Sequence, residues 1–338
     1  MQDHPMPEAA QSPNAVGLTA EVTRVAGSSL RALLFYGSQL VNARPGRASA
    51  WDLVVIVEDY RSFHRALCAA GHHRRPAWLL TLLGHLLPPN VMAFTPADPD
   101  LPLAKCLVVS VSDFERAMSP AASDHFLKGR MVQQVAVLWA SDTSAEHWAH
   151  DVLARARGDV LDWCAPWLPA EFTASDLART FLSVSYGAEL RPEGGERVEQ
   201  ILSAQQPFLR DAYEVVLDHA VRAGTVVGVA PGRFRLSEFP TRRHHNRVER
   251  YFLRSKIRST LRWFKHIVTF NDWLTYIQKK VERRTGLQIE VTKWERRLPL
   301  ILLWPKVFYV LQHRDGVPSK NAPAPTAQPS DPASSGTE

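Results

Sequence analysis

The pair Gly37-Ser38 follows a short apolar run at residues 33–36 and could bind a phosphate group. Glycine has no side chain, so the backbone there can approach a triphosphate closely. Ser38 can donate its hydroxyl and its N–H to phosphate oxygens, at the predicted start of a helix. Asp52 opens the next apolar run, and Mg²⁺ prefers carboxylate and phosphate oxygens as ligands. These residues predict phosphoryl or nucleotidyl transfer, with a metal that neutralises the leaving pyrophosphate.

This layout resembles that of nucleotidyltransferase-fold enzymes, whose second strand normally carries two carboxylates two residues apart. Here the neighbours of Asp52 at that spacing are Ala50 and Val54. Glu58 lies about 20 Å away along an extended strand, too far to share a metal with Asp52. The alternative is that Gly37-Ser38 is a plain turn and Asp52 an exposed residue at a strand end. The candidates for a second metal ligand are Asp59, Asp113 and Glu115.

Apolar runs and helical spacing alternate between residues 18 and 140, which predicts an α/β arrangement around these residues. Strands are predicted at 33–36, 52–57, 91–95, 105–111 and 132–139. Helices are predicted at 21–31 and at 62–87, with a break near 72–73. Further along, residues 145–222 are predicted to be mostly helical, 225–236 a hairpin, 246–285 a basic helix and 298–312 one more helix.

The predicted fold class is α+β, with a nucleotidyltransferase-fold α/β domain at residues 14–144. A mostly helical domain follows at 145–240, where a hairpin after two helices is typical of a winged helix. A basic C-terminal helical region is predicted at 241–315. Residues 1–13 are predicted to be a disordered leader, and 316–338 a disordered tail rich in Pro, Ser and Ala.

Charge is distributed unevenly over the 338 residues, whose formal net charge is +6. Residues 240–315 contain 18 Lys and Arg but only 6 Asp and Glu, so this region is expected to meet phosphate on nucleic acid or on a lipid surface. Its cations alternate with aromatic residues, which fits either a solvated helix face or an interface with lipid headgroups. The cations are Arg254, Lys256, Arg258, Arg262 and Lys265, and the aromatic residues are Tyr251, Phe252, Trp263 and Phe264.

No apolar run reaches the roughly 18 residues that a membrane-spanning helix needs. The longest, 298–311, contains two prolines and a lysine, and it could be a core helix or an anchor on a membrane surface. The three cysteines are far apart and form no CxxC pair, which favours a reducing compartment. The N-terminus has neither signal-peptide nor transit-peptide character, which favours a bacterial cytosol.

Several segments are similar, in the same order, to segments of the mitochondrial-type phosphatidate cytidylyltransferases, the translocator assembly and maintenance family. They are FYGSQL, WDLVVIVEDY, Phe63-His64, AKCLVVS, KGRMVQQVAVL, SYGAELR and IRSTLRWFKHIVTF. The shared order from about residue 33 to residue 270 carries the resemblance. The chain departs from the family's pattern where Glu189 replaces an aspartate, in the Ser-Thr-Lys spacing, and in lacking a glycine-rich turn after that lysine.

The resemblance implies roles for particular residues. Asp52 would be the metal ligand, and Asp52, Lys105 and Arg191 would be catalytic. The nucleotide would be bound by Gly37, Ser38, Lys105 and Arg130. The phosphate of the second substrate would be bound by Glu189, Arg191, Arg258, Ser259, Thr260 and Lys265.

The resemblance also implies a reaction, in which CTP and phosphatidate give CDP-diacylglycerol and pyrophosphate with Mg²⁺ as the cofactor. The attacking phosphate oxygen is already anionic, so the protein has to position and neutralise charge more than to supply a nucleophile. The implied partner is an anionic membrane surface, at the cytoplasmic face of a bacterial inner membrane.

The sequence is also compatible with two other functions. One is nucleotidyl transfer to a soluble or nucleic-acid acceptor; however, residues 211–223 contain one arginine, Arg222, beside three carboxylates, which argues against nucleic acid on that helix. The other is a non-catalytic lipid-binding protein on a degenerate fold, which the single strand carboxylate suggests.

Overall fold

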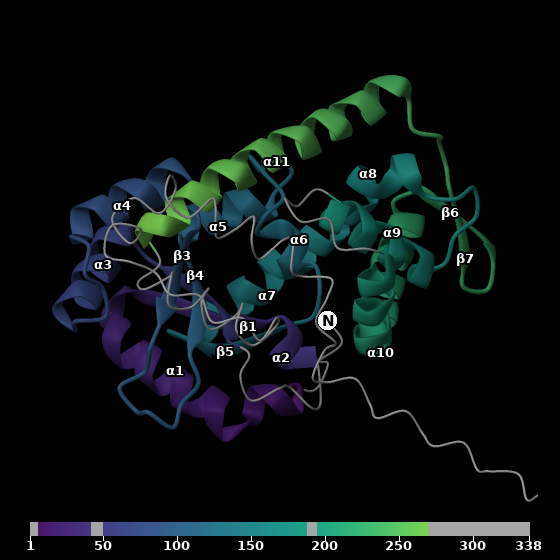
Figure 1. Cartoon of the computed structure of the whole chain (residues 1–338). Coiled ribbons are helices and arrows are strands. Elements are labelled where there is room, and N and C mark those ends of the chain that lie inside the picture. The colour runs from purple at the N-terminus through teal and green to yellow at the C-terminus, as the bar shows by residue number, and fades with distance from the viewer. Residues whose placement is uncertain (1–5, 42–49, 188–194, 270–338) are drawn as a thin grey trace, which may run out of the picture. The chain divides into compact units, whose positions relative to one another are not determined.

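Five strands form one mixed sheet in the order β3-β4-β2-β1-β5 (Figure 1). The computed structural model describes residues 6–41, 50–187 and 195–269. Strands β2 and β4 run parallel, and the other neighbouring pairs run antiparallel. The strands are β1 (Leu30–Tyr36), β2 (Trp51–Val57), β3 (Asn90–Phe94), β4 (Ala104–Ser110) and β5 (Val135–Ala140). Because β1, β2 and β4 lie in the middle of the sheet and are covered on both faces, their sequences are almost continuously apolar.

The two faces of the sheet pack against different helices. On one face, α1 (Pro13–Ala26) and α3 (Tyr60–Ala69) form an apolar core with Leu53, Val55 and Val57 of β2. Side chains alternate along a strand, so Asp52 belongs to the opposite face. The helices α5 (Val111–Met118) and α7 (Thr143–Gly158) contact the sheet there.

Polar residues fix where several helices begin. The side chains of Asp59, Ser110 and Asp142 accept backbone N–H groups at the starts of α3, α5 and α7. Such caps satisfy donors that a first helical turn leaves without partners. The other helices are α2 (Ser38–Val41), α4 (Ala77–Leu86), α6 (Lys128–Met131), α8 (Val160–Cys164), α9 (Ala174–Gly187), α10 (Gly195–Arg222) and α11 (Arg242–Thr269).

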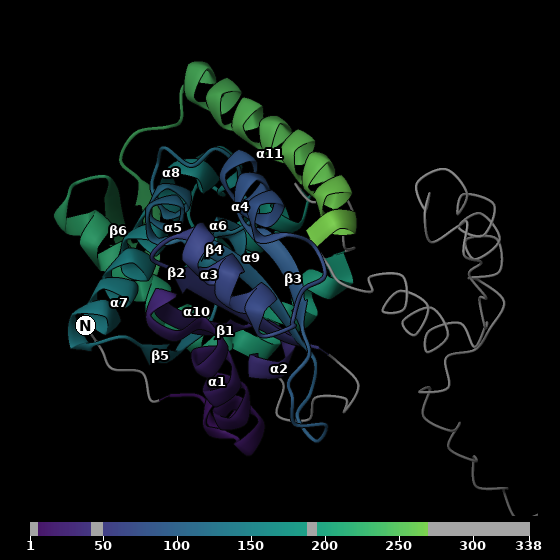
Figure 2. The ribbon, with the colours of Figure 1, turned by 90° about the vertical axis from the view of Figure 1, so that its left-hand side faces the viewer.

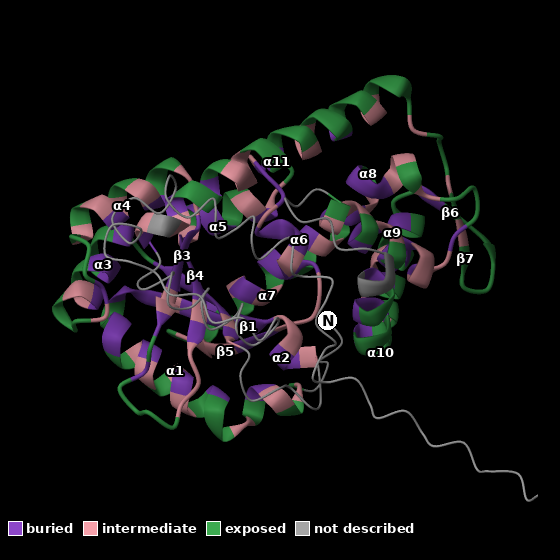
Figure 3. Cartoon of the chain, in the orientation of Figure 1, coloured by how far each residue is buried: buried purple, intermediate pink, exposed green. Residues whose placement is uncertain are grey.

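A two-stranded hairpin, β6 (Val226–Ala230) and β7 (Arg233–Leu236), leads into α11, which runs back to β3 and α4 (Figures 1 and 2). Contacts hold this helix near both ends. Near its start, Arg247 Nη2 lies 3.0 Å from Asp162 Oδ1. At its end, the Thr269 hydroxyl donates to the Val91 carbonyl at 2.9 Å. Much of the surface of α11 between these contacts is exposed (Figure 3).

The α+β class is confirmed, and so are the five predicted strands, the break near residues 72–73 and the hairpin, with shifts of a few residues at their ends. None of the helices in the described ranges is long and apolar enough to cross a membrane. The segments 298–312 and 316–338 lie outside the described residues.

Two sequence predictions differ from the structure. The helix predicted at 21–31 ends at Ala26, because Gly27 has a φ of +54° and β1 begins at Leu30. The leader predicted at 1–13 contains a 3₁₀ helix, Glu8–Gln11, whose Ala10 is buried in the core. Residues Met1–Asn271 form one compact unit, and the domain boundaries predicted at 144 and 240 within it stay predictions.

Candidate functional site

A cavity of about 230 Å³ opens at the ends of the three central strands. Its floor comes from the sheet. Its walls come from residues 125–134 around α6 (the α6 region) and from α9, α10 and α11. Of the residues that the structure describes, the lining contains two cationic side chains, Lys105 and Arg130, and one carboxylate, Asp52. The other lining residues are Tyr36, Gly37, Ser38, His125, Phe126, Gly129, Gln133, Gln134, Ser185, Tyr186, Gln205, Ser255 and Ser259.

Strand register brings together the three residues of the floor. Asp52 of β2 pairs with Tyr36 of β1 on one side and with Lys105 of β4 on the other. The ammonium of Lys105 lies 3.7 Å from Asp52 Oδ1, and both side chains are partly exposed, at 32% and 24%. This separation is longer than a good hydrogen bond, so both groups keep the capacity to bind a ligand.

Gly37 holds the turn above this pair in a conformation that other residues rarely adopt. Its φ is +86°, and a Cβ placed on it would lie 2.8 Å from Asp52 Oδ2. The sequence therefore has glycine here for two reasons, the left-handed backbone and the close approach to the carboxylate. Ser38 follows as the first residue of α2, as predicted, and it lines the cavity.

Residues 125–134, around α6, form another wall of the cavity. The guanidinium of Arg130 lies over the ring of Phe126, with its carbon 4.2 Å from the ring centroid. A Cβ on Gly129 would come within 2.8 Å of the ring of His125, so this wall is also closely packed. Both cations predicted to bind nucleotide, Lys105 and Arg130, thus line the same cavity.

His125 is a residue of the site that the sequence reasoning missed. Its ring is buried, Nε2 lies 2.8 Å from the Ser185 hydroxyl, and Nδ1 lies 3.3 Å from the Tyr251 hydroxyl. Its backbone N–H donates to the Ser255 hydroxyl at 2.9 Å. These partners are 60 to 130 residues away in the sequence, so no local spacing could have revealed them.

A glutamine cluster is the second missed feature. The Gln134 backbone N–H donates to Gln205 Oε1 at 2.9 Å, and Gln205 Nε2 donates to Gln133 Oε1 at 3.2 Å. Gln133 and Gln134 lie inside KGRMVQQVAVL, one of the segments similar to the family, but nothing in the sequence of α10 distinguishes Gln205 from a surface glutamine.

Acid is expected to destabilise the protein through two buried histidines, His64 and His125. Burial lowers the pKa of each to about 3, from an ordinary value of 6.5. Between these pH values the unfolded chain binds protons that the native protein does not, so stability is complete above pH ~6.5 and falls as the pH falls toward 3. At pH ~5 each histidine costs about 2 kcal/mol.

Urea unfolding at about pH 7.5 and about pH 5 checks this expectation. The lower pH should move the midpoint to markedly less urea, and it should do so equally in His147→Gln, which changes an exposed histidine. Identical midpoints at the two pH values would contradict it.

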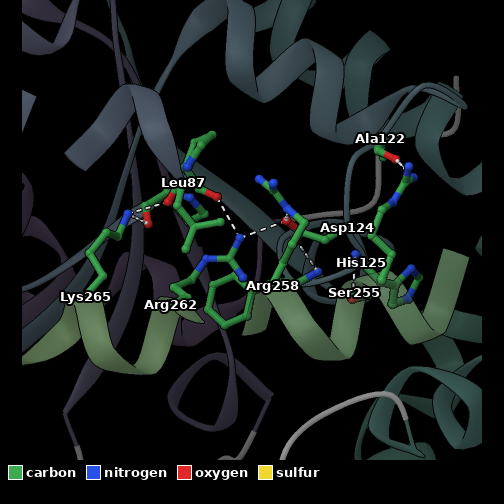
Figure 4. A network of polar contacts seen from close by, with 12 residues as sticks. Leu87, Ala122, Asp124, His125, Ser255, Arg258, Arg262 and Lys265 are labelled. Carbon is green, nitrogen blue, oxygen red and sulfur yellow. Dashed lines mark hydrogen bonds and ion pairs between the residues drawn. The ribbon is translucent and has the colours of Figure 1, made fainter. Parts of the chain in front are cut away.

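The residues of α11 that were predicted to bind phosphate separate into two groups. Ser259 lines the cavity. Thr260 donates its hydroxyl to the Lys256 carbonyl one turn earlier on its own helix. Arg258 Nε donates to Asp124 Oδ2 at 2.7 Å, and neither Arg258 nor Thr260 is among the cavity residues (Figure 4).

The predicted phosphate contact of Lys265 is wrong in this arrangement. Its ammonium is buried and donates to the carbonyls of Leu83, Leu87 and Pro89 (Figure 4). Burial, followed by the neighbouring Arg262 guanidinium, lowers the pKa of Lys265 well below its ordinary value. Three carbonyls already occupy the three donors of this ammonium, so it serves to attach α11 to the end of α4.

The remaining residues that the sequence analysis singled out are not among the described residues that line the cavity. Glu189 and Arg191 lie outside the described residues. His64 is buried, with Thr81 and Asn90 as its ring partners, so it has a structural role in the core. The three candidates for a second metal ligand have other partners: Asp59 caps α3, Asp113 accepts from the Tyr60 hydroxyl, and Glu115 accepts from the Trp148 indole.

The donor set at Asp52 fits Mg²⁺. This ion is usually held by one or two carboxylates together with substrate phosphates and several waters. Asp52 supplies one such carboxylate, its side chain faces the cavity, and about 230 Å³ leaves room for phosphate oxygens and waters. Among the described residues no group of three or more Cys, His, Asp or Glu forms a metal cluster.

Over the residues that the structure describes, the protein is thus an α+β protein. Its strand-end cavity combines one carboxylate, two cations and a glycine-serine turn. No protein-family model matches this sequence, and no curated protein matches it.

Proposed function

We propose that the protein is a Mg²⁺-dependent phosphatidate cytidylyltransferase with a nucleotidyltransferase fold. In this reaction an oxygen of the phosphatidate phosphate forms a bond to the α-phosphorus of CTP, and the bond from that phosphorus to the pyrophosphate oxygen breaks. The observation that carries the proposal is the placement of Asp52 and Lys105 side by side under the Gly37 turn, with Arg130 lining the same cavity. The ordered resemblance to the cytidylyltransferase family supports the choice of substrates.

Asp52 would hold Mg²⁺, which when bound supplies positive charge to the phosphate oxygens of CTP. The absence of a side chain at Gly37 lets the triphosphate approach the strand ends, and Ser38 can donate its hydroxyl to a phosphate oxygen. Lys105 and Arg130 would neutralise the charge that develops on the leaving pyrophosphate. Phosphatidate is itself the nucleophile, so no covalent intermediate with the protein is needed.

The remaining parts of the proposal concern location and acceptor. The acceptor is a membrane lipid, so we place the protein at an anionic membrane surface, as a peripheral protein at the cytoplasmic face of a bacterial inner membrane. The helices α9 and α10 and the hairpin that follows them form the winged-helix-like part, and α9 and α10 each supply walls of the cavity.

The direct test incubates the purified full chain with CTP labelled at the α-phosphate, Mg²⁺ and phosphatidate in detergent micelles. Labelled CDP-diacylglycerol is expected. In parallel reactions, glycerol 3-phosphate or RNA replaces phosphatidate as the acceptor. Label on either of these and not on lipid would overturn the choice of acceptor, and CTP binding without any transfer would favour the non-catalytic alternative.

Gly37→Ala is expected to lower cytidylyl transfer by at least about a hundredfold, because a displacement of about 1 Å in a catalytic group costs that much. The new Cβ would meet Asp52 Oδ2 at 2.8 Å and must displace the carboxylate. The value of kcat/KM for CTP measures the effect. Gly27→Ala is the matched control, since Gly27 also has a positive φ but nothing within 4 Å of its Cβ position. Equal losses in the two variants would show that backbone strain, and not the contact with Asp52, is responsible.

A further inference from the structure

The helix α11 has its charged and apolar faces reversed relative to an ordinary surface helix. Arg262 and Lys265 are buried against the protein. Leu253, Ile257, Leu261 and Phe264 recur every three or four residues on the outer side, and they are between 47% and 61% exposed. A surface helix normally turns its apolar stripe toward the core.

Specific partners explain why the buried side of α11 tolerates charge. Asp124 pairs with both Arg258 and Arg262, and backbone carbonyls at the end of α4 receive Lys265 (Figure 4). These contacts fix the rotation of the helix about its axis. The apolar side chains are therefore held outward, and they cannot turn inward without breaking a buried ion-pair network.

The outer side of α4 also carries exposed apolar side chains. Trp78, Leu82 and Leu86 are spaced by four residues and are between 48% and 68% exposed. The last turns of α11 lie beside the end of α4, as the contact of Lys265 with the Leu83 carbonyl at 3.3 Å shows (Figures 1 and 2). We call the seven residues the apolar face: Trp78, Leu82, Leu86, Leu253, Ile257, Leu261 and Phe264.

Exposed cations accompany the apolar face. The helix α11 contains nine basic residues and one acidic residue, Glu249. Those turned to solvent include Arg250 and Lys256. Apolar side chains flanked by cations bind the interface of an anionic bilayer, because the apolar groups enter the headgroup–acyl boundary and the cations stay among the phosphates.

We propose that the apolar face is the surface by which this protein docks on an anionic phospholipid bilayer. The proposal rests on the proposed function, since it takes the acceptor to be a membrane lipid. The same helix contributes Ser255 and Ser259 to the cavity, so α11 contacts the bilayer with one side and borders the cavity with another. A lipid headgroup leaving the bilayer beside α11 would thus reach the cavity by passing a single helix.

The test measures flotation of the full chain with vesicles of phosphatidylcholine, with and without phosphatidylglycerol. One variant replaces Leu253, Ile257, Leu261 and Phe264 by Gln. The matched control replaces four exposed valines elsewhere by Gln, namely Val215, Val221, Val227 and Val229. Wild type and control are expected to float with the phosphatidylglycerol vesicles, and the α11 variant is expected to partition at least about tenfold more weakly. Arg250→Gln and Lys256→Gln should each weaken partitioning to the anionic vesicles about fivefold.

Several results would overturn the proposal. One is equal flotation of the α11 variant and wild type. A second is no flotation of wild type, with a smaller apparent mass of the variant, which would show that a second copy covers the face. A third is no flotation of wild type, with faster proteolysis of residues 272–338 in the variant, which would show that the chain's own C-terminal segment covers it.

The micellar CTP assay separates this proposal from the proposed function. Transfer in micelles by a wild type that does not float would leave the function standing and overturn the docking surface. Flotation that depends on the apolar face, without transfer to any acceptor, would leave the docking surface standing and overturn the proposed function.

Discussion

Asp52→Asn is expected to reduce cytidylyl transfer by about a thousandfold or more while leaving the fold intact. The amide has the shape of the carboxylate but lacks its charge, so it would hold Mg²⁺ poorly. Lys105, 3.7 Å away, would also lose its ionic partner. Because Asp52 is the one carboxylate among the described residues that line the cavity, no described neighbour can replace it as metal ligand.

The labelled-CTP assay in micelles measures this effect, and urea unfolding shows whether the fold survives. Glu58→Gln is the matched control, because Glu58 directly follows the other end of the same strand and its carboxylate is 51% exposed. That variant should transfer at the wild-type rate. Undiminished transfer by Asp52→Asn would remove Asp52 from the mechanism and overturn its role as metal ligand.

Asp124→Ala is expected to lower the free energy of unfolding by about 3–5 kcal/mol, since it leaves buried cations without their partner. Asp124 Oδ2 accepts from Arg258 at 2.7 Å and from Arg262 at 2.9 Å. Burial alone would raise the pKa of Asp124, but the two guanidinium groups outweigh burial and hold it below its ordinary value. Since Arg262 is almost fully buried, water cannot replace the lost carboxylate.

Urea unfolding of the full chain near neutral pH measures the loss. Asp162→Ala is the matched control, because Asp162 also pairs with an arginine of α11, Arg247, at 3.0 Å, but both side chains are more than 60% exposed. An exposed ion pair contributes about 0–1 kcal/mol, so the control should unfold almost as wild type does. Similar losses in the two variants would show that the buried pair does not anchor α11.

The candidate site residues could be predicted to a large extent from the sequence. The continuous apolar runs at β1, β2 and β4 mark central strands, because only strands covered on both faces need so little polarity. Gly37-Ser38 and Asp52 stand at the ends of two such runs, and Lys105 is the second residue of β4. The structure brings these residues together in one cavity, with Arg130 on its wall.

The role of α11 could not be predicted in the same way. Its sequence shows cations and aromatic residues interleaved, and helical periodicity determines which of them share a side. Periodicity does not determine which side meets the protein, and here the side with Arg262 and Lys265 does so. The partners that decide this, Asp124 and the carbonyls of α4, are more than 130 residues away in the sequence.

The sequence by itself therefore determined the α+β class, the strands and the glycine, serine and aspartate at their ends, because each depends on apolar patterning or on the chemistry of one residue. Only the tertiary structure decided that Lys265 is a structural cation, that His125 is buried in the cavity wall, and that the apolar face points outward. The physical reason is that burial and ion pairing depend on groups that only folding brings into contact.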